Sequence, residues 1–569
     1  MSMGRSFLGF VAIGIAGFAT IASAETSIAG FKPALETESI GLLPADGFRL
    51  RTGNCPACAV PKQNLWYFQN ELIAVPANGA AASGFSRGVD RNTDVVRWAV
   101  TTESAQLAHP SVVWIGSPGI LEGATVLPGA QTLRTADGQE IGLKLVPQLP
   151  TNRSYANDAT AAWLAGRQVR MRGALEDVNG RPTIIARMIW PSDFAIEPAT
   201  LKTEPLKHPS GLTDFVRASA GEGKSVDTRL LWERHPGQER AWKDKPVLGI
   251  VLNGAQGDDD ESLGGHFAVA TGRFGDKGDW SSWAVNNFYN LDSVSEKGIL
   301  AATVPMDNYL MDLNSGQQYY RPSVMLVAIL NNARTAIAYQ GGIQRVFNHF
   351  YRHDFRYRHA AANCTGISVD VVDALGWHIP KRGPTAPLKS IGAYGYVAAT
   401  DGSLASGRKI YDYLNEEQIR LLPAVGFDAI GQDLLQLVAT EGMPKRPLSR
   451  YEQQLREDVE AILLVRIPQV PSSRAMGSAP VFSFDEFRSR VPADQADWKI
   501  VPVGARPFPA ALRDADLTPD EDPSVVPLPV AGIGVGIGAI LAGVVWRRRA
   551  RPAGKARPVQ RAPETADAE

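Results

Sequence analysis

Two apolar runs and one amphipathic segment define the central part of the chain. Residues 247–252, VLGIVL, form an uninterrupted run that is typical of a buried strand. After a loop rich in glycine and aspartate, residues 264–270, GGHFAVA, indicate a second strand that begins near His266. In residues 363–376 the apolar positions recur at helical spacing, at Cys364, Ile367, Val371 and Leu375. The pattern therefore predicts two strands followed, about a hundred residues later, by an amphipathic helix.

The ends of that helix make Cys364 chemically interesting. Asn363 is a favoured N-cap residue, and Gly376 is suited to close the helix. Cys364 falls in the first turn, where unpaired N–H groups stabilise a thiolate and lower its pKa. Cys364 is therefore a candidate nucleophile. The alternative is a buried structural cysteine that packs at the start of a core helix.

The other two cysteines lie close together in the sequence. Cys55 and Cys58 form a CPAC pair, and the chain holds three cysteines in all. In an exported protein such a pair predicts a disulfide, with a redox site or a zinc half-site as the alternatives. Cys364 is then left without an evident partner.

A general base is expected at His266. A histidine that begins a strand beside a glycine pair has room to turn its ring toward a cleft, and imidazole is the commonest protein base. His353 and His359 are the alternatives, because they lie nearer to Cys364 in a basic and aromatic segment, residues 351–359.

Three pieces in this order resemble a known family: GGH at 264–266, the asparagine-bearing WAVNNF at 283–288, and NCT at 363–365. The run from about 247 to 376 is similar to the N-terminal periplasmic domain of the lipoprotein intramolecular transacylase family, which are circularly permuted papain-like thiol enzymes. The resemblance implies Cys364 as nucleophile and His266 as its base, with Asn287 or Asn286 as the third member.

The same resemblance implies acyl transfer that involves a lipid or lipoprotein as acyl donor and acceptor, and no cofactor or metal is expected. Gly265 departs from the family pattern, which commonly has a bulkier residue before the histidine, so the acyl pocket is expected to differ in shape. An acidic run at 258–261 does not match a calcium-binding loop, and it is interpreted as a solvated loop.

A peptidoglycan amidase or peptidase is the alternative enzyme function. A catalytically inactive envelope binding or scaffold protein is the other alternative.

The two ends of the chain predict where the protein resides. Residues 1–24 have a basic residue, an apolar run and an ASA ending, which is the pattern of a signal peptide. Residues 527–546 carry no charge, and three arginines follow at 547–549, which predicts a transmembrane helix with a cytoplasmic tail at 547–569. We therefore expect a single-pass protein of the inner membrane whose catalytic body faces the periplasm or the outside.

The remaining segments complete an α+β fold. Residues 25–204 are β-rich, and a hairpin at 168–189 with an Asn179–Gly180 turn suits a small barrel. Residues 205–385 form the expected papain-like catalytic domain. Residues 386–507 are expected to be mostly helical, with a capping box at Ser449 and Glu452 opening a helix that Pro468 ends. A Pro- and Asp-rich linker, 508–526, precedes the predicted membrane helix.

Composition adds one exclusion. Apolar residues make up 44% of the chain and charged residues 21%, as in ordinary globular proteins. The net charge is −1, but without the signal peptide and tail the basic residues fall from 58 to 50 and the acidic ones from 59 to 56, giving about −6. An acidic outer part makes nucleic acid an unsuitable partner. The oligomeric state is not indicated by the sequence.

Overall fold

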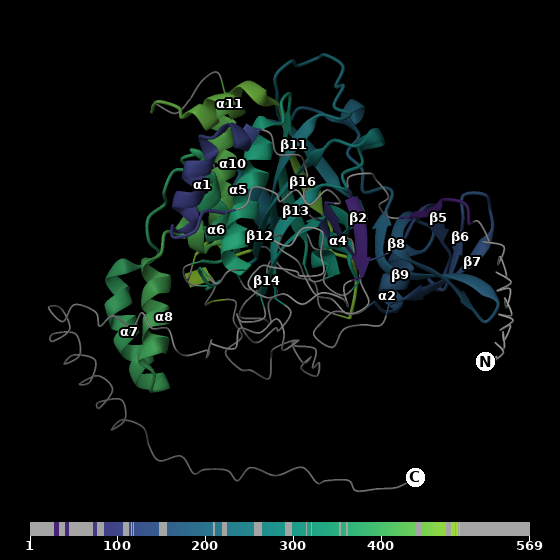
Figure 1. Ribbon diagram of the computed structural model, residues 1–569, viewed down its shortest axis with the longest axis horizontal. Helices are drawn as coiled ribbons and strands as arrows, with labels where there is room; N and C mark the ends of the chain where they lie inside the picture. The colour runs from purple at the N-terminus through teal and green to yellow at the C-terminus, as the bar shows by residue number, and fades with distance from the viewer. Residues whose placement is uncertain are drawn as a thin grey trace, which may run out of the picture.

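The structure is a computed structural model, and Figure 1 shows a barrel at one side of a larger body built from a sheet and helices. It describes residues 28–33, 40–44, 72–76, 85–105, 113–114, 117, 119–146, 156–208, 211–218, 223, 225–254, 264–290, 299–313, 316–319, 321–351, 354–359, 362–439, 446–473, 480–483, 485–486 and 489. Several sequence predictions fall outside these residues: the signal peptide, Cys55 and Cys58, the acidic run 258–261, the linker 508–526, the segment 527–546 and the basic tail.

The barrel is a closed ring of five strands. In chain order its first and fourth strands lie at the two edges of the five-stranded sheet, and pairing between these two edge strands closes the ring. The strands are β5 (Gly119–Val126), β6 (Thr132–Arg134), β7 (Glu140–Leu145), β8 (Gln168–Val178) and β9 (Arg181–Pro191), and β1 (Phe31–Pro33) adds to β5. Helix α2 (Asp158–Leu164) connects β7 to β8. The hairpin predicted at 168–189 is confirmed. Asn179 and Gly180 both have positive φ, 57° and 78°, as a two-residue hairpin turn requires.

The larger body is organised around an antiparallel sheet of seven strands in the order β10-β16-β15-β11-β12-β13-β14. The strands are β10 (Asp227–Glu233), β11 (Pro246–Asn253), β12 (His266–Arg273), β13 (Ala284–Asn290), β14 (Ile299–Pro305), β15 (Ser323–Leu330) and β16 (Val459–Ile467). Every residue of β11 and β15 is buried, which fits their central places and their uninterrupted apolar sequences. A separate small sheet joins β2 (Ile40–Pro44), β3 (Leu72–Pro76) and β4 (Val113–Trp114).

Helices cover this sheet (Figure 1). They are α1 (Arg91–Ala99), α3 (Gly211–Arg217), α4 (Met306–Met311), α5 (Arg334–Tyr351), α6 (Cys364–Leu375), α7 (Pro387–Asp401), α8 (Leu404–Asn415), α9 (Gln418–Leu421), α10 (Pro423–Val438) and α11 (Arg450–Asp458). Helices α5, α6 and α10 pack against β12, whereas α4 lies between the sheet and β9 of the barrel.

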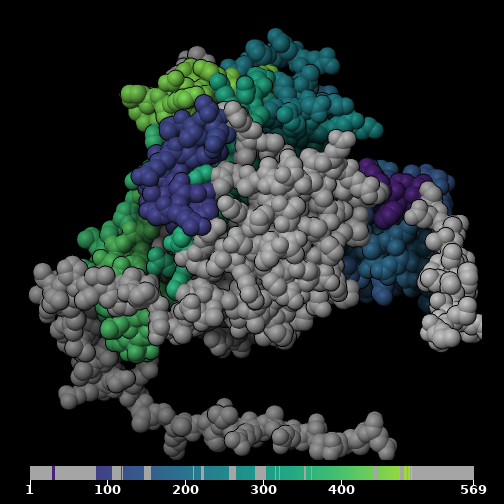
Figure 2. Space-filling model, in the orientation of Figure 1, coloured from purple at the N-terminus to yellow at the C-terminus, as the bar shows by residue number. Residues whose placement is uncertain are grey.

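Helix α1 comes from the segment that was expected to form the N-terminal domain, yet it packs on α5 and α6 and lies at the surface of the larger body in Figure 2. Buried charges fix it there. Asp94 accepts hydrogen bonds from Arg345 at 2.6 and 3.1 Å and contacts Nε2 of His349 at 2.8 Å. Part of the predicted β-rich region therefore packs on the larger body instead.

The fold expected from the sequence is corrected in its C-terminal part. The capping box at Ser449 and Glu452 is present, but the helix that it opens ends at Asp458 rather than at Pro468. Residues 459–467 form β16, which pairs with both β10 and β15. Seven of its nine residues are buried, so this apolar run is an inner strand of the sheet and not the end of a solvated helix.

The papain-like description is corrected as well, whereas the membrane helix predicted at 527–546 lies outside the described residues. In the part of the chain that the structure describes, no helix combines the length and apolar character needed to cross a bilayer. The expected permuted papain-like domain with a mostly helical C-terminal region is wrong, because the described residues form a mixed helix-and-strand body and a closed five-stranded barrel.

Two buried ion pairs join the barrel to the larger body. Nε of Arg172 on β8 lies 2.8 Å from Oδ2 of Asp307, and Nε of Arg187 on β9 lies 2.6 Å from Oδ2 of Asp312. Both aspartate side chains are completely buried, and the arginine side chains are at most 9% exposed. A buried charge is costly without its partner, so these pairs fix how the barrel sits on α4.

Candidate active site

The site lies where α6 and β12 begin. Asn363 caps α6, since its Oδ1 accepts a hydrogen bond of 2.8 Å from the N–H of Gly366. Its amide nitrogen donates to the carbonyl oxygens of His359 and Leu421, both at 3.0 Å. Gly376 ends the helix with a φ of 103°, which favours glycine. The predicted helix and both of its ends are confirmed.

Burial raises the pKa of the Cys364 thiol, because the side chain is nearly excluded from water. The charge of His266 and a hydrogen bond from its imidazole act on the Cys364 thiol to lower its pKa, as do the backbone N–H of Phe267 and the hydroxyl of Thr365, which lies 3.9 Å from the sulfur. The nearby charge of His266 and these hydrogen bonds outweigh burial and hold the pKa at about 7. At neutral pH a large share of Cys364 is therefore thiolate, the nucleophilic form.

Asn287 is the residue that holds the imidazole from the other side. Its Oδ1 is hydrogen-bonded to Nε2 of His266. Since a carbonyl oxygen can only accept, Nε2 carries the hydrogen, and Nδ1 is the ring nitrogen left for the thiol. The structure thus brings Cys364, His266 and Asn287 together in one chain of hydrogen bonds.

Asn286, the alternative third member, points elsewhere. Successive side chains of a strand face opposite sides of the sheet, so Asn286 and Asn287 diverge. The amide of Asn286 exchanges hydrogen bonds with Gln340 of α5 at 2.9 and 3.0 Å, and its Oδ1 accepts a bond of 2.7 Å from Thr303. Asn286 is part of a buried polar network behind the sheet.

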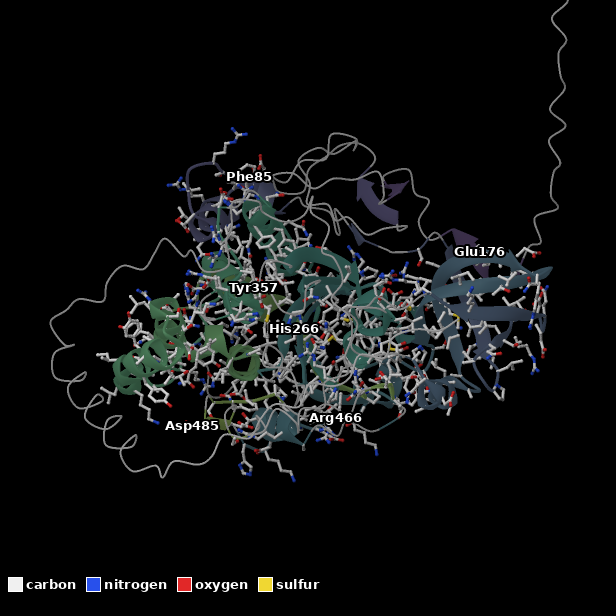
Figure 3. All side chains as sticks on the ribbon, turned by 90° about the horizontal axis from the view of Figure 1, so that it is seen from below. Phe85, Glu176, His266, Tyr357, Arg466 and Asp485 are labelled. Atoms are coloured by element: carbon white, nitrogen blue, oxygen red, sulfur yellow. The ribbon has the colours of Figure 1, made fainter. Side chains whose placement is uncertain are left out.

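Of the two alternative bases, only His359 is among the described residues. The ring of His359 stands edge-on to Tyr357, with ring centroids 5.3 Å apart, and His353 lies outside the described residues. Figure 3 shows His266 in the central part of the body. The barrel, on which Glu176 is labelled, lies to one side of it.

Tyr357 is a site residue that sequence reasoning missed. Its hydroxyl oxygen accepts a hydrogen bond of 3.1 Å from the backbone N–H of Cys364, and its side chain is buried. The N–H groups of the first helical turn were expected to be unpaired and to stabilise the thiolate, but those of Cys364 and Gly366 are bonded to Tyr357 and Asn363. Tyr357 was one of several aromatic residues in 351–359, and spacing alone did not show that its hydroxyl reaches the nucleophile.

Gly265 is required by the backbone. It has a φ of 89°, and a Cβ there would lie 2.7 Å from the carbonyl oxygen of Asn253 and 2.8 Å from Cβ of Pro480. A larger residue would therefore be strained and would clash with both neighbours. The departure from the family pattern reflects the packing of the Pro480 segment against the start of β12.

An aromatic cluster adjoins Tyr357. The ring of Phe288 on β13 lies 5.4 Å from that of Tyr357, 5.4 Å from Phe347 and 5.9 Å from Phe350. Phe350 in turn lies 5.8 Å from Phe355, and both of these are only partly buried. We call Phe288, Phe347, Phe350, Phe355 and Tyr357 the aromatic wall.

Other aromatic residues between positions 267 and 289 are not part of this wall. Trp280 and Trp283 are completely buried, and Trp280 packs against Trp190 of the barrel with centroids 4.8 Å apart. They build the junction with the barrel. The side chain of Phe267 is buried in the core, and only its backbone N–H acts on the Cys364 thiol. The side chain of Tyr289 lies outside the described residues.

Arginines from two other helices hold α6 in place. Asp370 accepts hydrogen bonds from Arg420 of α9 at 2.8 and 3.0 Å and from Arg91 of α1 at 3.0 Å. Because Asp370 is on the helix that begins with Cys364, these bonds hold Cys364 in position.

Within the described ranges, no group of three or more His, Cys, Asp or Glu side chains is arranged to hold a metal ion. Comparison with protein-family models, with curated proteins and with solved structures finds no match for this chain.

Proposed function

We propose that the chain is a cysteine-dependent acyltransferase or hydrolase that acts on the acyl groups of lipids or lipoproteins through an acyl-thioester on Cys364. The observation that carries the proposal is the thiol whose pKa is about 7 and which is hydrogen-bonded to His266, itself bonded to Asn287. A lowered thiol pKa with an oriented imidazole is the arrangement of an activated nucleophile.

In the first step, the thiolate of Cys364 attacks the carbonyl carbon of an ester. The new S–C bond forms, and the tetrahedral intermediate collapses by breaking the C–O bond of the leaving alcohol. His266 gives its proton to that alcohol oxygen, and Asn287 keeps the ring oriented through Nε2. Tyr357, whose hydroxyl oxygen lies 3.1 Å from the backbone nitrogen of Cys364, is assigned as the donor to the developing oxyanion.

In the second step, an acceptor resolves the thioester. An amine or a water molecule gives its proton to His266 and attacks the thioester carbonyl, and the C–S bond breaks to restore the thiolate. An amine acceptor makes the reaction an acyl transfer, whereas water makes it a hydrolysis.

The aromatic wall supports an acyl substrate. A bound acyl chain needs a continuous apolar surface, and each buried methylene contributes about 0.8 kcal/mol. The wall begins at Tyr357, which touches the backbone of Cys364, and extends to the partly exposed Phe350 and Phe355. The site is proposed to work in the cell envelope, outside the cytoplasm, as the signal peptide predicts.

The test is to look for the covalent intermediate. Purified protein incubated with phospholipid vesicles is expected to gain the mass of one acyl chain on Cys364, which hydroxylamine releases. Cys364→Ser should abolish that adduct, because a serine hydroxyl stays protonated at neutral pH and is a far weaker nucleophile than the thiolate.

Two results would contradict the proposal. Release of stem-peptide fragments from peptidoglycan sacculi, without an acyl adduct from any lipid tested, would assign the site to a cell-wall amidase or peptidase. Absence of every adduct and of any hydrolysis would assign the chain to the inactive scaffold class.

The role of Tyr357 gives a separate prediction. Tyr357→Phe removes the hydroxyl and is expected to slow acylation of Cys364 by about 10²–10³-fold, the usual loss of one oxyanion donor. Reaction of Cys364 with iodoacetamide should change little, because alkylation forms no oxyanion. An equal loss in both reactions would show that Tyr357 only positions the nucleophile.

A further inference from the structure

Helices α7 and α8 form a hairpin that extends away from the body in Figure 1. Gly402 ends α7 in the left-handed region, and Ser403 caps α8. The helices approach closely at Gly407, where a Cβ would lie 2.7 Å from the carbonyl oxygen of Tyr394. Ser390 is the one buried residue of α7, and α8 buries Gly407 and Leu414. The hairpin is therefore packed mainly on itself.

This hairpin concentrates exposed apolar side chains. Six large apolar residues are exposed in the part of the chain that the structure describes, and four of them are on the hairpin: Leu388, Ile391, Tyr396 and Leu404. Leu388 is 97% exposed. From Ser390 to Thr400, eleven successive residues of α7 carry no charge. Such a concentration of exposed apolar side chains on a projecting hairpin indicates a surface that a membrane or another molecule covers.

The charges of the hairpin are few and mostly basic. Arg408 is paired with Asp412 at 2.7 Å, which leaves Lys389 and Lys409 against Asp401. Four tyrosines are present in the two helices, at 394, 396, 411 and 413. Exposed apolar residues with tyrosines and a basic rim are the composition of a helix that lies in a membrane interface.

Both ends of the hairpin connect to the nucleophile. Helix α6 precedes it, and α9 follows it, where Arg420 binds Asp370 of α6. The chain beyond Ser489 continues for 37 residues, at most about 130 Å when extended, to the uncharged stretch 527–546 and its arginines. An uncharged apolar stretch that is followed by arginines associates with bilayers, so the hairpin stays within reach of one.

We infer that the α7–α8 hairpin docks the protein on a lipid bilayer and so presents Cys364 to acyl chains at that surface. The inference rests on the proposed function for the identity of the substrate. Contact between the hairpin and lipid does not require that function.

The direct test uses the full chain as its Cys364→Ala variant, so that catalysis plays no part. It is reconstituted in vesicles of phosphatidylcholine and phosphatidylglycerol that contain a phospholipid with a diazirine in its acyl chain. After illumination, lipid adducts are expected on peptides from 387–415. The region around Val96 and Val100, which is also exposed but lies on α1, serves as the internal control.

Adducts confined to other segments, with none in 387–415, would overturn the inference. So would concentration-dependent crosslinks between hairpins of two chains, which would assign the surface to a second copy.

A kinetic test separates this inference from the proposed function. The triple variant Leu388→Glu, Tyr396→Glu and Leu404→Glu is expected to lower acylation by vesicle phospholipid about tenfold or more. Acylation by the water-soluble p-nitrophenyl butyrate should stay unchanged, and Val100→Glu should change neither. Equal loss with both donors would mean that the hairpin supports the fold rather than docking. If lipid adducts form on the hairpin of a protein that forms no thioester, the proposed function is contradicted and the docking inference is not.

Discussion

Replacing His266 with alanine is expected to slow acylation of Cys364 at neutral pH by about 10²–10⁴-fold, the usual contribution of a positioned acid–base group. The change removes the charge and the hydrogen bond that lower the thiol pKa, and it removes the proton donor for the leaving group. Single-turnover acylation, followed by mass spectrometry of the intact protein, measures the rate.

His378→Gln is the matched control, since this histidine follows the other end of α6 and pairs with Asp373 at 3.0 Å. Its side chain is 55% exposed, so the substitution should leave the rate unchanged. A rate in His266→Ala within a few-fold of the unmodified protein would mean that another group serves as base.

The largest loss of stability is expected from Asp307→Ala. The substitution leaves the guanidinium of Arg172 buried without its partner, which costs about 3–5 kcal/mol. The barrel should detach from the body at lower urea concentration, as followed by the fluorescence of the tryptophans at the junction, Trp190 and Trp280.

Glu140→Ala is the comparison, because Glu140 pairs with Arg134 at 3.0 Å on the barrel surface, where both side chains are about half exposed. Its loss should change the free energy of unfolding by less than about 1 kcal/mol. Equal effects of the two substitutions would contradict the role given to the buried pair.

Local signals in the sequence predicted the site best where the chemistry is local. Asn363 and Gly376 fixed the ends of α6, and the position of Cys364 in the first turn followed from them. The apolar run 247–252 is fully buried in β11, and the Asn179–Gly180 turn forms as its composition indicates. Each of these depends on a few adjacent residues.

What the sequence did not predict depends on contacts between distant segments. Residues 459–467 were taken as the end of a helix because a capping box precedes them, and only pairing with β10 and β15 makes them a strand. Likewise, α1 belongs to the larger body through Asp94 and Arg345, which are 251 positions apart. The hydroxyl of Tyr357 contacts the backbone N–H of Cys364 because the loop before α6 folds back on the helix start. The sequence spacing of the two residues does not predict this contact.

The choice between Asn286 and Asn287 shows the same limit. Strand alternation required that only one of them face His266, but which one depends on the register of β13 against β12, where Val269 is opposite Asn286. That register places Asn286 toward α5 and Asn287 toward His266.

The central claim, a Cys364 thiolate maintained by His266, is tested most directly by the pH dependence of alkylation. Iodoacetamide reacts with the thiolate, so the rate rises with pH through the thiol pKa. In the unmodified protein the rate at Cys364 is expected to be half-maximal near pH 7. In His266→Ala the midpoint should move above about 8.5, the value of an ordinary thiol, because burial then acts unopposed by the imidazole. A midpoint at or above 8.5 in the unmodified protein, or the same midpoint in both proteins, would contradict the claim.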